Sequence, residues 1–311
     1  MRDEPAIAVQ EVCRTFGDIV ALDQVTLTIP RGIVFGFLGP NGAGKTTMIR
    51  LLLGLLEPTG GTARVLGFDV PQDGRQVRER TGALLEHAGL YERLSARQNL
   101  DFFARIWRLG GAERNRRIAE LLDRMSLLDR AHETVGNWSR GMKQKLAVAR
   151  ALLHRPELVF LDEPTAGLDP VAAAELRNDL AELSRGDGVT VFLTTHNLAE
   201  AEKLCDLVGV IANGRLKALG TPEQLRSQEK GKELTIRGRG FDGELLAQLQ
   251  RRPDVVEVKT AIDGIKLRLE SDAPVAPIVR EIILGGADVE EVVRGKGSLE
   301  DFFIELMEEE A

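Results

Sequence analysis

The chain has 311 residues, of which 43% are apolar and 29% charged, and its formal net charge is −7. This composition predicts a soluble globular protein of two domains; its longest apolar runs, such as 51–56, are too short to span a bilayer, and it lacks the basic excess typical of nucleic-acid binding. With two cysteines, Cys13 and Cys205, and no signal-peptide pattern at its first residues, we expect no disulfide framework and a reducing, cytosolic setting.

A phosphate-binding loop is the first motif along the chain. Residues 33–38 predict a short buried strand, and Gly39-Pro-Asn-Gly-Ala-Gly-Lys-Thr46 after it fits the P-loop pattern. Gly42 and Gly44 let backbone N–H groups turn toward a phosphate, and Lys45 supplies a flexible point charge. Thr46 offers a hydroxyl to Mg²⁺ and opens a helix expected over 46–56, whose positive end faces the same anion. The alternative is an ordinary Gly-rich turn.

The remainder of the first 226 residues predicts an α/β fold with an insertion. Residues 1–73 and 156–226 alternate short Val/Ile/Leu-rich strands with helical segments. Residues 74–155 carry Arg, Glu and Leu at helical spacing. We therefore expect a P-loop domain over 1–226 that contains a helical subdomain at about 74–155.

A second helix start resembles an anion site. Ser139 is a good N-cap, and the helix after it carries an apolar stripe from Met142 to Leu153 before it stops near Pro156. A helix start with Ser and Gly is a second position where an anion can bind. One chain thus carries two helix N-termini suited to phosphate.

Two further strands end in chemically active side chains. The apolar strand 158–162 ends in Asp162 and Glu163, which fit the metal-side carboxylate and the general base for an attacking water. The β-branched strand 189–195 ends at His196, which can donate a hydrogen bond to a γ-phosphate or to the water. Two charges at a strand end are also common without function, and the other three histidines fit ordinary surface or core positions.

The pattern changes after a polar linker at 227–232. Strands are expected at 233–239, 255–260, 265–270 and 287–293, and helices at 243–252, 277–284 and 299–310. Asp263-Gly264 between the second and third strands is a hairpin signal. The order βαββαβ plus one helix predicts a small α+β, ferredoxin-like domain over 233–311.

Taken together, the motifs resemble the nucleotide-binding subunit of an ATP-binding cassette (ABC) transporter. The resemblance covers residues 16–215 and rests on five motifs in order: the P-loop, the signature Ser139–Gln144, the Walker B pair Asp162 and Glu163, the D-loop Ala166–Asp169, and His196. It implies that ATP and Mg²⁺ bind at a head-to-tail dimer interface, between the P-loop of one copy and the signature of the other. ATP closes this dimer, and hydrolysis lets it open.

The resemblance also implies roles for individual residues. Metal contacts fall to Thr46, Asp162 and Glu86, and catalysis to Glu163, His196 and Lys45. Contacts with ATP fall to Phe16, Gly39, Pro40, Asn41, Gly42, Ala43, Gly44, Lys45, Thr46, Thr47, Glu86, Ser139, Arg140, Gly141, Met142 and Asp169. Phe16 occupies the position of an aromatic that stacks on adenine, although its residue type alone fits a core position.

Two positions depart from the family pattern. The signature usually reads Leu-Ser-Gly-Gly-Gln, whereas this chain has Arg140 between Ser139 and Gly141. The loop after strand 81–85 usually carries Gln, whereas this chain has Glu86, which accepts hydrogen bonds but does not donate when ionised.

The form of the signature, Glu86 and the ending Ser298–Leu306 resemble the drug- and antibiotic-export ATPases that pair with a separate ABC-2-type membrane protein. This implies an ATPase subunit on the cytoplasmic face of the cell membrane, in which an apolar stretch around Tyr91, Phe102 and Trp107 receives the membrane partner. The last domain is then accessory, either stabilising a dimer or regulating it, or its apolar stripe simply packs on its own domain.

Two alternatives remain open at this stage. A soluble cassette ATPase acting on ribosomes or DNA usually carries two cassettes or a long coiled-coil insertion, neither of which occurs here. A homodimer is favoured because both halves of the site are intact, but a heterodimer with another ABC ATPase is an alternative. A GTPase would need an Asn/Thr-Lys-x-Asp motif, which the chain lacks.

Overall fold

The computed structural model describes residues 4–227, 231–261, 263–270, 273–295 and 298–308. The chain forms two compact units, Met1–Pro222 and Glu223–Ala311. Residues 228–230 of the linker expected at 227–232, and the last two residues of the helix expected at 299–310, lie outside the described residues. Residues 231 and 232 belong to a strand of the second unit, so the linker ends earlier than predicted. Each unit has its own core and is considered separately.

A six-stranded sheet forms the centre of the first unit, in the order β10-β9-β3-β8-β7-β6. Its strands are β3 (Val34–Leu38), β6 (Thr81–Leu84), β7 (Leu158–Asp162), β8 (Thr190–Thr195), β9 (Leu207–Ala212) and β10 (Arg215–Gly220). All run parallel except β10. Strands β3, β7 and β8 are buried along their whole length, which is typical of parallel strands covered on both faces. The predicted α/β core is confirmed.

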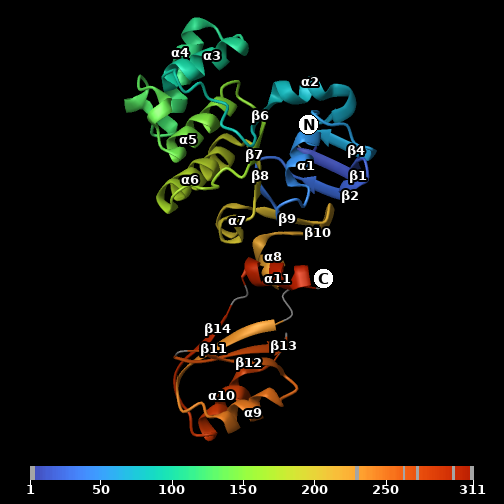
Figure 1. Ribbon diagram of the computed structural model, residues 1–311, viewed down its shortest axis with the longest axis vertical. Coiled ribbons are helices and arrows are strands. Elements are labelled where there is room, and N and C mark those ends of the chain that lie inside the picture. Colours follow the sequence, from blue (N-terminus) through green and yellow to red (C-terminus); the bar gives the residue numbers. More distant parts are fainter. Residues whose placement is uncertain (1–3, 228–230, 262, 271–272, 296–297, 309–311) are drawn as a thin grey trace. The chain divides into compact units, whose positions relative to one another are not determined.

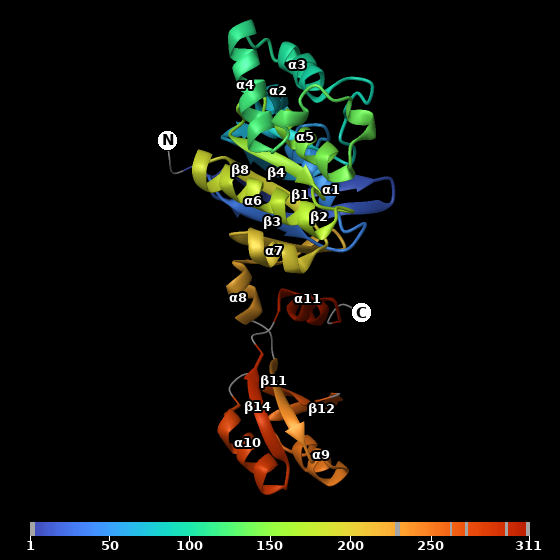
Figure 2. The same ribbon diagram turned by 90° about the vertical axis from the view of Figure 1, so that its left-hand side faces the viewer.

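Different layers cover the two faces of this sheet, as Figures 1 and 2 show. One face carries α5 (Arg140–Ala151), α6 (Pro170–Asp187) and α7 (Leu198–Leu204). The other carries α1 (Lys45–Leu52) and an antiparallel sheet of β1 (Ile7–Phe16), β2 (Ile19–Ile29), β4 (Gly60–Val65) and β5 (Phe68–Asp69). Between the two sheets lies the main core, where the rings of Phe35, Phe37, Phe160 and Phe192 are completely buried.

Helix α1 is shorter than expected. It ends at Leu52 rather than at residue 56, although the apolar pattern continues beyond it. Gly54 adopts a left-handed φ of +64°, and its N–H binds the carbonyl of Leu51. A glycine in this conformation is the common stop signal of a helix.

The helical zone expected at 74–155 contains α3 (Ala96–Ile106), α4 (Gly111–Arg124), α5 and two 3₁₀ turns, Leu128–Arg130 and Val135–Asn137. It also contains the end of α2 (Val70–Arg80) and strand β6, which pairs with β7 in the central sheet.

Helix α8 (Pro222–Ser227) follows β10. Among the described residues, no helix has the length and apolar character needed to cross a membrane.

The second unit has the predicted βαββαβ order, followed by a helix. Its elements are β11 (Gly231–Arg239), α9 (Gly243–Gln250), β12 (Val255–Ala261), β13 (Gly264–Glu270), α10 (Val275–Leu284), β14 (Asp288–Arg294) and α11 (Leu299–Glu308). The strands form one antiparallel sheet in the order β12-β13-β11-β14. Along β13, Ile265, Leu267 and Leu269 are buried and alternate with exposed neighbours, so one face of the sheet packs in the core. The α+β prediction is confirmed.

Candidate active site

The ends of three neighbouring strands bring the predicted motifs together. In the parallel register, Leu38 of β3 pairs with Thr195 of β8, and Asp162 of β7 pairs with Thr194. The P-loop, Glu163 and His196 each follow one of these strands. They therefore meet at the carboxyl edge of the sheet, where α/β proteins bind their ligands.

The P-loop has a backbone that requires glycine. Gly42 and Gly44 have φ values of +83° and +108°, which other residues rarely adopt. A Cβ atom on Gly44 would also lie 2.5 Å from the carbonyl oxygen of Ala21. Conformation favours glycine at both positions, and at Gly44, the N-cap of α1, the lack of space excludes a larger side chain as well.

Lys45 is a buried cation inside this loop, with 7% of its surface exposed. Its Nζ donates to the carbonyl oxygens of Gly39 at 2.7 Å and Pro40 at 3.1 Å. The same ammonium lies 3.5 Å from Oε1 of Glu163. These contacts hold the ammonium inside the loop, where a negatively charged oxygen would be a stronger acceptor than a carbonyl.

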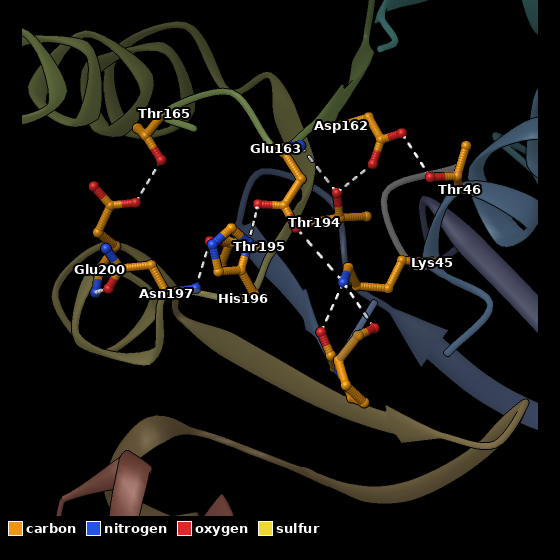
Figure 3. A network of polar contacts seen from close by, with 12 residues as sticks. Lys45, Thr46, Asp162, Glu163, Thr165, Thr194, Thr195, His196, Asn197 and Glu200 are labelled. Carbon is orange, nitrogen blue, oxygen red and sulfur yellow. Dashed lines mark hydrogen bonds and ion pairs between the residues drawn. The ribbon is translucent and has the colours of Figure 1, made fainter. Parts of the chain in front are cut away.

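Asp162 is engaged through both of its carboxylate oxygens (Figure 3). Thr46 donates its hydroxyl hydrogen to Oδ2 at 2.8 Å, and Thr194 donates to Oδ1 at 2.6 Å. A hydroxyl beside a carboxylate is a donor set that suits Mg²⁺, which takes few protein ligands and keeps waters and phosphate oxygens. Consistent with this, the described residues contain no group of three or more His, Cys, Asp or Glu that would hold a metal unaided.

Glu163 adopts an unusual backbone conformation, with a φ of +50°. Such a conformation costs about 1–3 kcal/mol and persists only where the surroundings impose it. The N–H of Glu163 donates to the hydroxyl of Thr194 at 3.0 Å, and Oε2 lies 2.8 Å from Nδ1 of His196. Because 61% of the His196 side chain is exposed, its ring is free to meet an incoming ligand.

A cavity of about 400 Å³ opens above these residues. Its lining includes many of the residues expected to contact ATP or metal: Pro40, Asn41, Gly42, Gly44, Lys45, Thr46, Thr47, Glu86, Arg140, Asp162 and Glu163. Glu86 is well exposed, with its carboxylate 4.0 Å from the guanidinium of Arg50. The lining does not include Phe16, Gly39, Ala43, Ser139, Gly141, Met142, Asp169 or His196.

The hairpin of β1 and β2 supplies residues that the sequence analysis missed. Ile19 and Val20 line the cavity although they are 70% and 52% exposed. Phe16 pairs with Ile19 across the hairpin and lies under the guanidinium of Arg14, 4.4 Å from the ring centroid. Because Ile19 pairs with Phe16, which the resemblance placed at the adenine, this pairing could have indicated that Ile19 lies near the cavity. Ala21 and Leu85 were also missed, whereas the lining residues Gln144 and Ala166 belong to the predicted signature and D-loop motifs but were not assigned a contact with ATP.

The signature segment packs against the D-loop of the same chain. Ser139 caps α5 as predicted, since its hydroxyl accepts from the N–H of Met142 at 3.3 Å. A Cβ atom on Gly141 would lie 2.9 Å from Cβ of Ala172. Asp169 caps α6 by accepting from the N–H groups of residues 171 and 172 at 3.1 and 3.0 Å. Two capped helix starts therefore face each other here.

Comparisons with known proteins agree with this geometry. Residues 22–166 match the family described as ABC transporter, and residues 220–307 match the C-terminal domain of ATP-binding proteins like DrrA1-3. The chain is 38% identical to the daunorubicin resistance ATP-binding protein DrrA3 of Streptomyces coeruleorubidus, over 97% of this chain and 96% of the relative. It is 33% identical to the bacitracin transport ATP-binding protein BcrA of Bacillus licheniformis, over 97% of each chain.

A solved structure supports the same assignment. The dimeric ATP-binding cassette MJ0796, in a post-hydrolysis state bound to ADP and Pi, superposes with a TM-score of 0.62 at 26% identity. The match covers 69% of this chain and 98% of that one.

Proposed function

Because this chain belongs to the ATP-binding subunits of ABC transporters, we propose that it powers the export of drugs, antibiotics or other amphipathic compounds through a separate ABC-2-type membrane subunit. The chain is an ATPase. The observation that carries the proposal is the polar network of Lys45, Asp162, Glu163 and His196 at the carboxyl ends of β3, β7 and β8. The relatives' names supply the class of cargo.

Each residue of the network has a proposed task. Lys45 exchanges its carbonyl partners for phosphate oxygens, which are stronger acceptors for an ammonium. Glu163 accepts the proton of the attacking water, and His196, already 2.8 Å from Glu163, orients that carboxylate and donates to the γ-phosphate. The strained backbone of Glu163 keeps the base in this position before ATP arrives.

Thr46 and Asp162 are the residues that would hold Mg²⁺, and Glu86 lines the same cavity. When bound, the metal neutralises phosphate charge and orients the triphosphate. The two proposed metal ligands, the Thr46 hydroxyl and the Asp162 carboxylate, are hydrogen-bonded to each other at 2.8 Å, so they are already adjacent.

The signature segment is proposed to complete the site of a second copy. Ser139, Arg140, Gly141 and Met142 would approach the γ-phosphate bound to the partner's P-loop, and the similar cassette that is dimeric with ADP and Pi bound supports the presence of two copies. Symmetry then forms two sites. A homodimer is favoured because one chain carries both halves.

A groove in the first unit is proposed to receive the membrane subunit at the cytoplasmic face. A cavity of about 430 Å³ is lined by Leu55, Phe103, Trp107 and two arginines, Arg78 and Arg150, among others. Beside it, Tyr91 and Phe102 remain 48% and 41% exposed. Tyr91→Ala should weaken co-purification of the membrane subunit while ATPase activity persists; unchanged capture would contradict this docking site.

The proposed hydrolysis mechanism is tested by Glu163→Gln in the full chain. The variant keeps the shape of the side chain but loses its basicity, so hydrolysis should fall at least about 100-fold. It should still bind ATP and accumulate as a closed dimer in gel filtration with ATP and Mg²⁺. Glu157→Gln, on an exposed glutamate just before β7, is the matched control and should hydrolyse ATP normally. A Glu163→Gln protein that stays monomeric with ATP would contradict the two-copy site.

A further inference from the structure

A second link joins the loops that carry Glu163 and His196. Thr165, two residues after Glu163, donates its hydroxyl hydrogen to Oε2 of Glu200 at 2.5 Å. Oε1 of Glu200 accepts from Arg177 of α6 at 2.7 Å. Figure 3 shows the Thr165–Glu200 contact beside the Glu163–His196 contact. The β7–α6 loop is therefore tied to the β8–α7 segment at two points.

Helix α7 fixes Glu200 relative to His196. The helix begins directly after the capping residue Asn197, whose side chain accepts from the N–H of Glu200 at 3.1 Å. The N–H of Asn197 in turn donates to the hydroxyl of Thr195, the last residue of β8, at 2.9 Å. Because these bonds connect β8 to the start of α7 on both sides of His196, the positions of His196 and Glu200 are coupled.

Thr165 is fixed relative to Glu163 and the D-loop in a similar way. The carbonyl of Glu163 accepts from the N–H of Ala166 at 3.1 Å, and the carbonyl of Thr165 accepts from the N–H of Leu168 at 3.1 Å. These two tight turns leave little freedom between the proposed base and the D-loop. Through its hydroxyl, Thr165 joins this compact loop to Glu200 of α7 by a hydrogen bond.

Glu200 lies apart from the proposed nucleotide cavity. Neither Thr165 nor Glu200 lines that cavity; together with Arg177 they line a neighbouring one of about 380 Å³. Only 12% of the Glu200 side chain is exposed. A partly buried carboxylate of this kind persists where its partners satisfy it, as Thr165 and Arg177 do here.

We propose that Glu200 is a positioning residue, which holds Glu163 and His196 in register by fastening Thr165. This inference rests on the proposed role of Glu163 in hydrolysis. Because Glu163 has a strained backbone, its position depends on such contacts. Without the Thr165–Glu200 hydrogen bond, the β7–α6 loop is less restrained, so Glu163 spends less time in the position needed for hydrolysis. The proposed contacts between the P-loop and ATP remain.

The test compares Thr165→Val with Thr165→Ser in the full chain. Valine has the shape of threonine without its hydroxyl, so kcat should fall about tenfold, the effect expected for one hydrogen bond to a charged acceptor. The KM for ATP should change less than twofold, and serine should restore most of the lost kcat. Glu200→Gln, which keeps an acceptor for Thr165, should lose less activity than Glu200→Ala.

Thr190→Val is the matched control. Its hydroxyl accepts from the N–H of Gly32 at 2.9 Å, at the opposite end of β8, so its loss should lower thermal stability without lowering kcat. The inference is overturned if Thr165→Val retains full kcat, if its KM rises as much as its kcat falls, or if Thr190→Val loses as much kcat. Hydrolysis retained by Glu163→Gln would instead refute the proposed function, whatever Thr165→Val shows.

Discussion

The site of the first unit and the core of the second differ in what they bury. Among the described residues, the buried polar and charged side chains all lie in the first unit, and Lys45, Asp162, Thr194 and Thr195 belong to its site edge. The core of the second unit consists of apolar side chains from its sheet, α9 and α10. Its charges pair at the surface, as Arg252 does with Asp254 at 2.7 Å.

The difference indicates that the buried polar side chains at the site edge serve chemistry, whereas the apolar core of the second unit serves packing. Burying a polar group costs free energy unless its hydrogen bonds are satisfied, and at the site edge the partners of Lys45 and Asp162 satisfy them. In the first unit, a buried ammonium and a glutamate with positive φ occupy one sheet edge. We therefore expect substitutions at that edge to alter activity more than stability, and substitutions in the second core to do the reverse.

The largest effect is expected for Lys45→Ala. Removing a positioned cation from the proposed phosphate site should lower kcat/KM for ATP by about 100-fold or more. The melting temperature should fall by only a few degrees, because the loop that loses this donor lines a cavity in which water can replace it. ATPase assays and thermal denaturation of the full chain measure both. A large drop in melting temperature would show that Lys45 serves packing rather than chemistry.

The chemistry of this edge was accessible from sequence because each motif is local and ends a strand. The P-loop, Asp162, Glu163 and His196 each carry their own short pattern, and parallel strands bring such ends together. The link from Thr165 to Glu200 joins residues 35 apart through the geometry of two loops, so no local pattern contains it. The exposed pair Ile19 and Val20 likewise depends on how the β1–β2 hairpin meets the P-loop.

The limits of helices were the least predictable feature. The apolar run 51–56 continues the helical period, yet α1 stops at Leu52 because Gly54 turns left-handed. In the second unit, by contrast, the hairpin signal at Asp263-Gly264 and, in β13, the alternation of apolar and charged residues predicted both strands to within one residue of their ends. Periodicity finds an element, whereas its end depends on one residue's backbone conformation.

An intermediate effect is expected for Leu267→Ala in the second core. Leu267 is completely buried, and its truncation should lower the free energy of unfolding of this unit by about 2–5 kcal/mol. ATPase activity of the full chain should stay within about twofold. Proteolysis in increasing urea reports the stability of the unit, and Val256→Ala, at a 41% exposed position, is the control. A loss of ATPase activity as large as the loss of stability would contradict the expectation that substitutions in the second core alter stability more than activity.

The smallest effects concern acidification, which should act on the two units in different pH ranges. In the first unit, burial lowers the pKa of His154, whose ring stacks on Trp107 at 3.8 Å. Its Nε2–H donates to the carbonyl of Thr81 at 3.0 Å, which by itself favours the charged ring, but burial outweighs this bond and Nδ1 is buried without a partner among the described residues, so burial keeps the folded ring neutral. Below about pH 6.5 the unfolded chain takes up a proton that the folded ring resists, so stability falls. His154→Phe should keep the stacking and lessen this fall.

In the second unit the dependence has the same sign but begins lower. The hydrogen bonds from Arg252 hold the pKa of Asp254 below its ordinary value of 3.8. The stabilisation is therefore complete above that value and is lost only as pH falls through the lower, folded pKa. Asp254→Asn should lower the stability of the second unit at pH 7 and flatten its response below pH 4, without changing the response of the first unit. Circular dichroism and proteolysis between pH 7 and pH 3 follow both units. A second unit that loses stability between pH 7 and pH 5, where Asp254 stays ionised, would show that its stability does not depend on this surface pair in the way proposed.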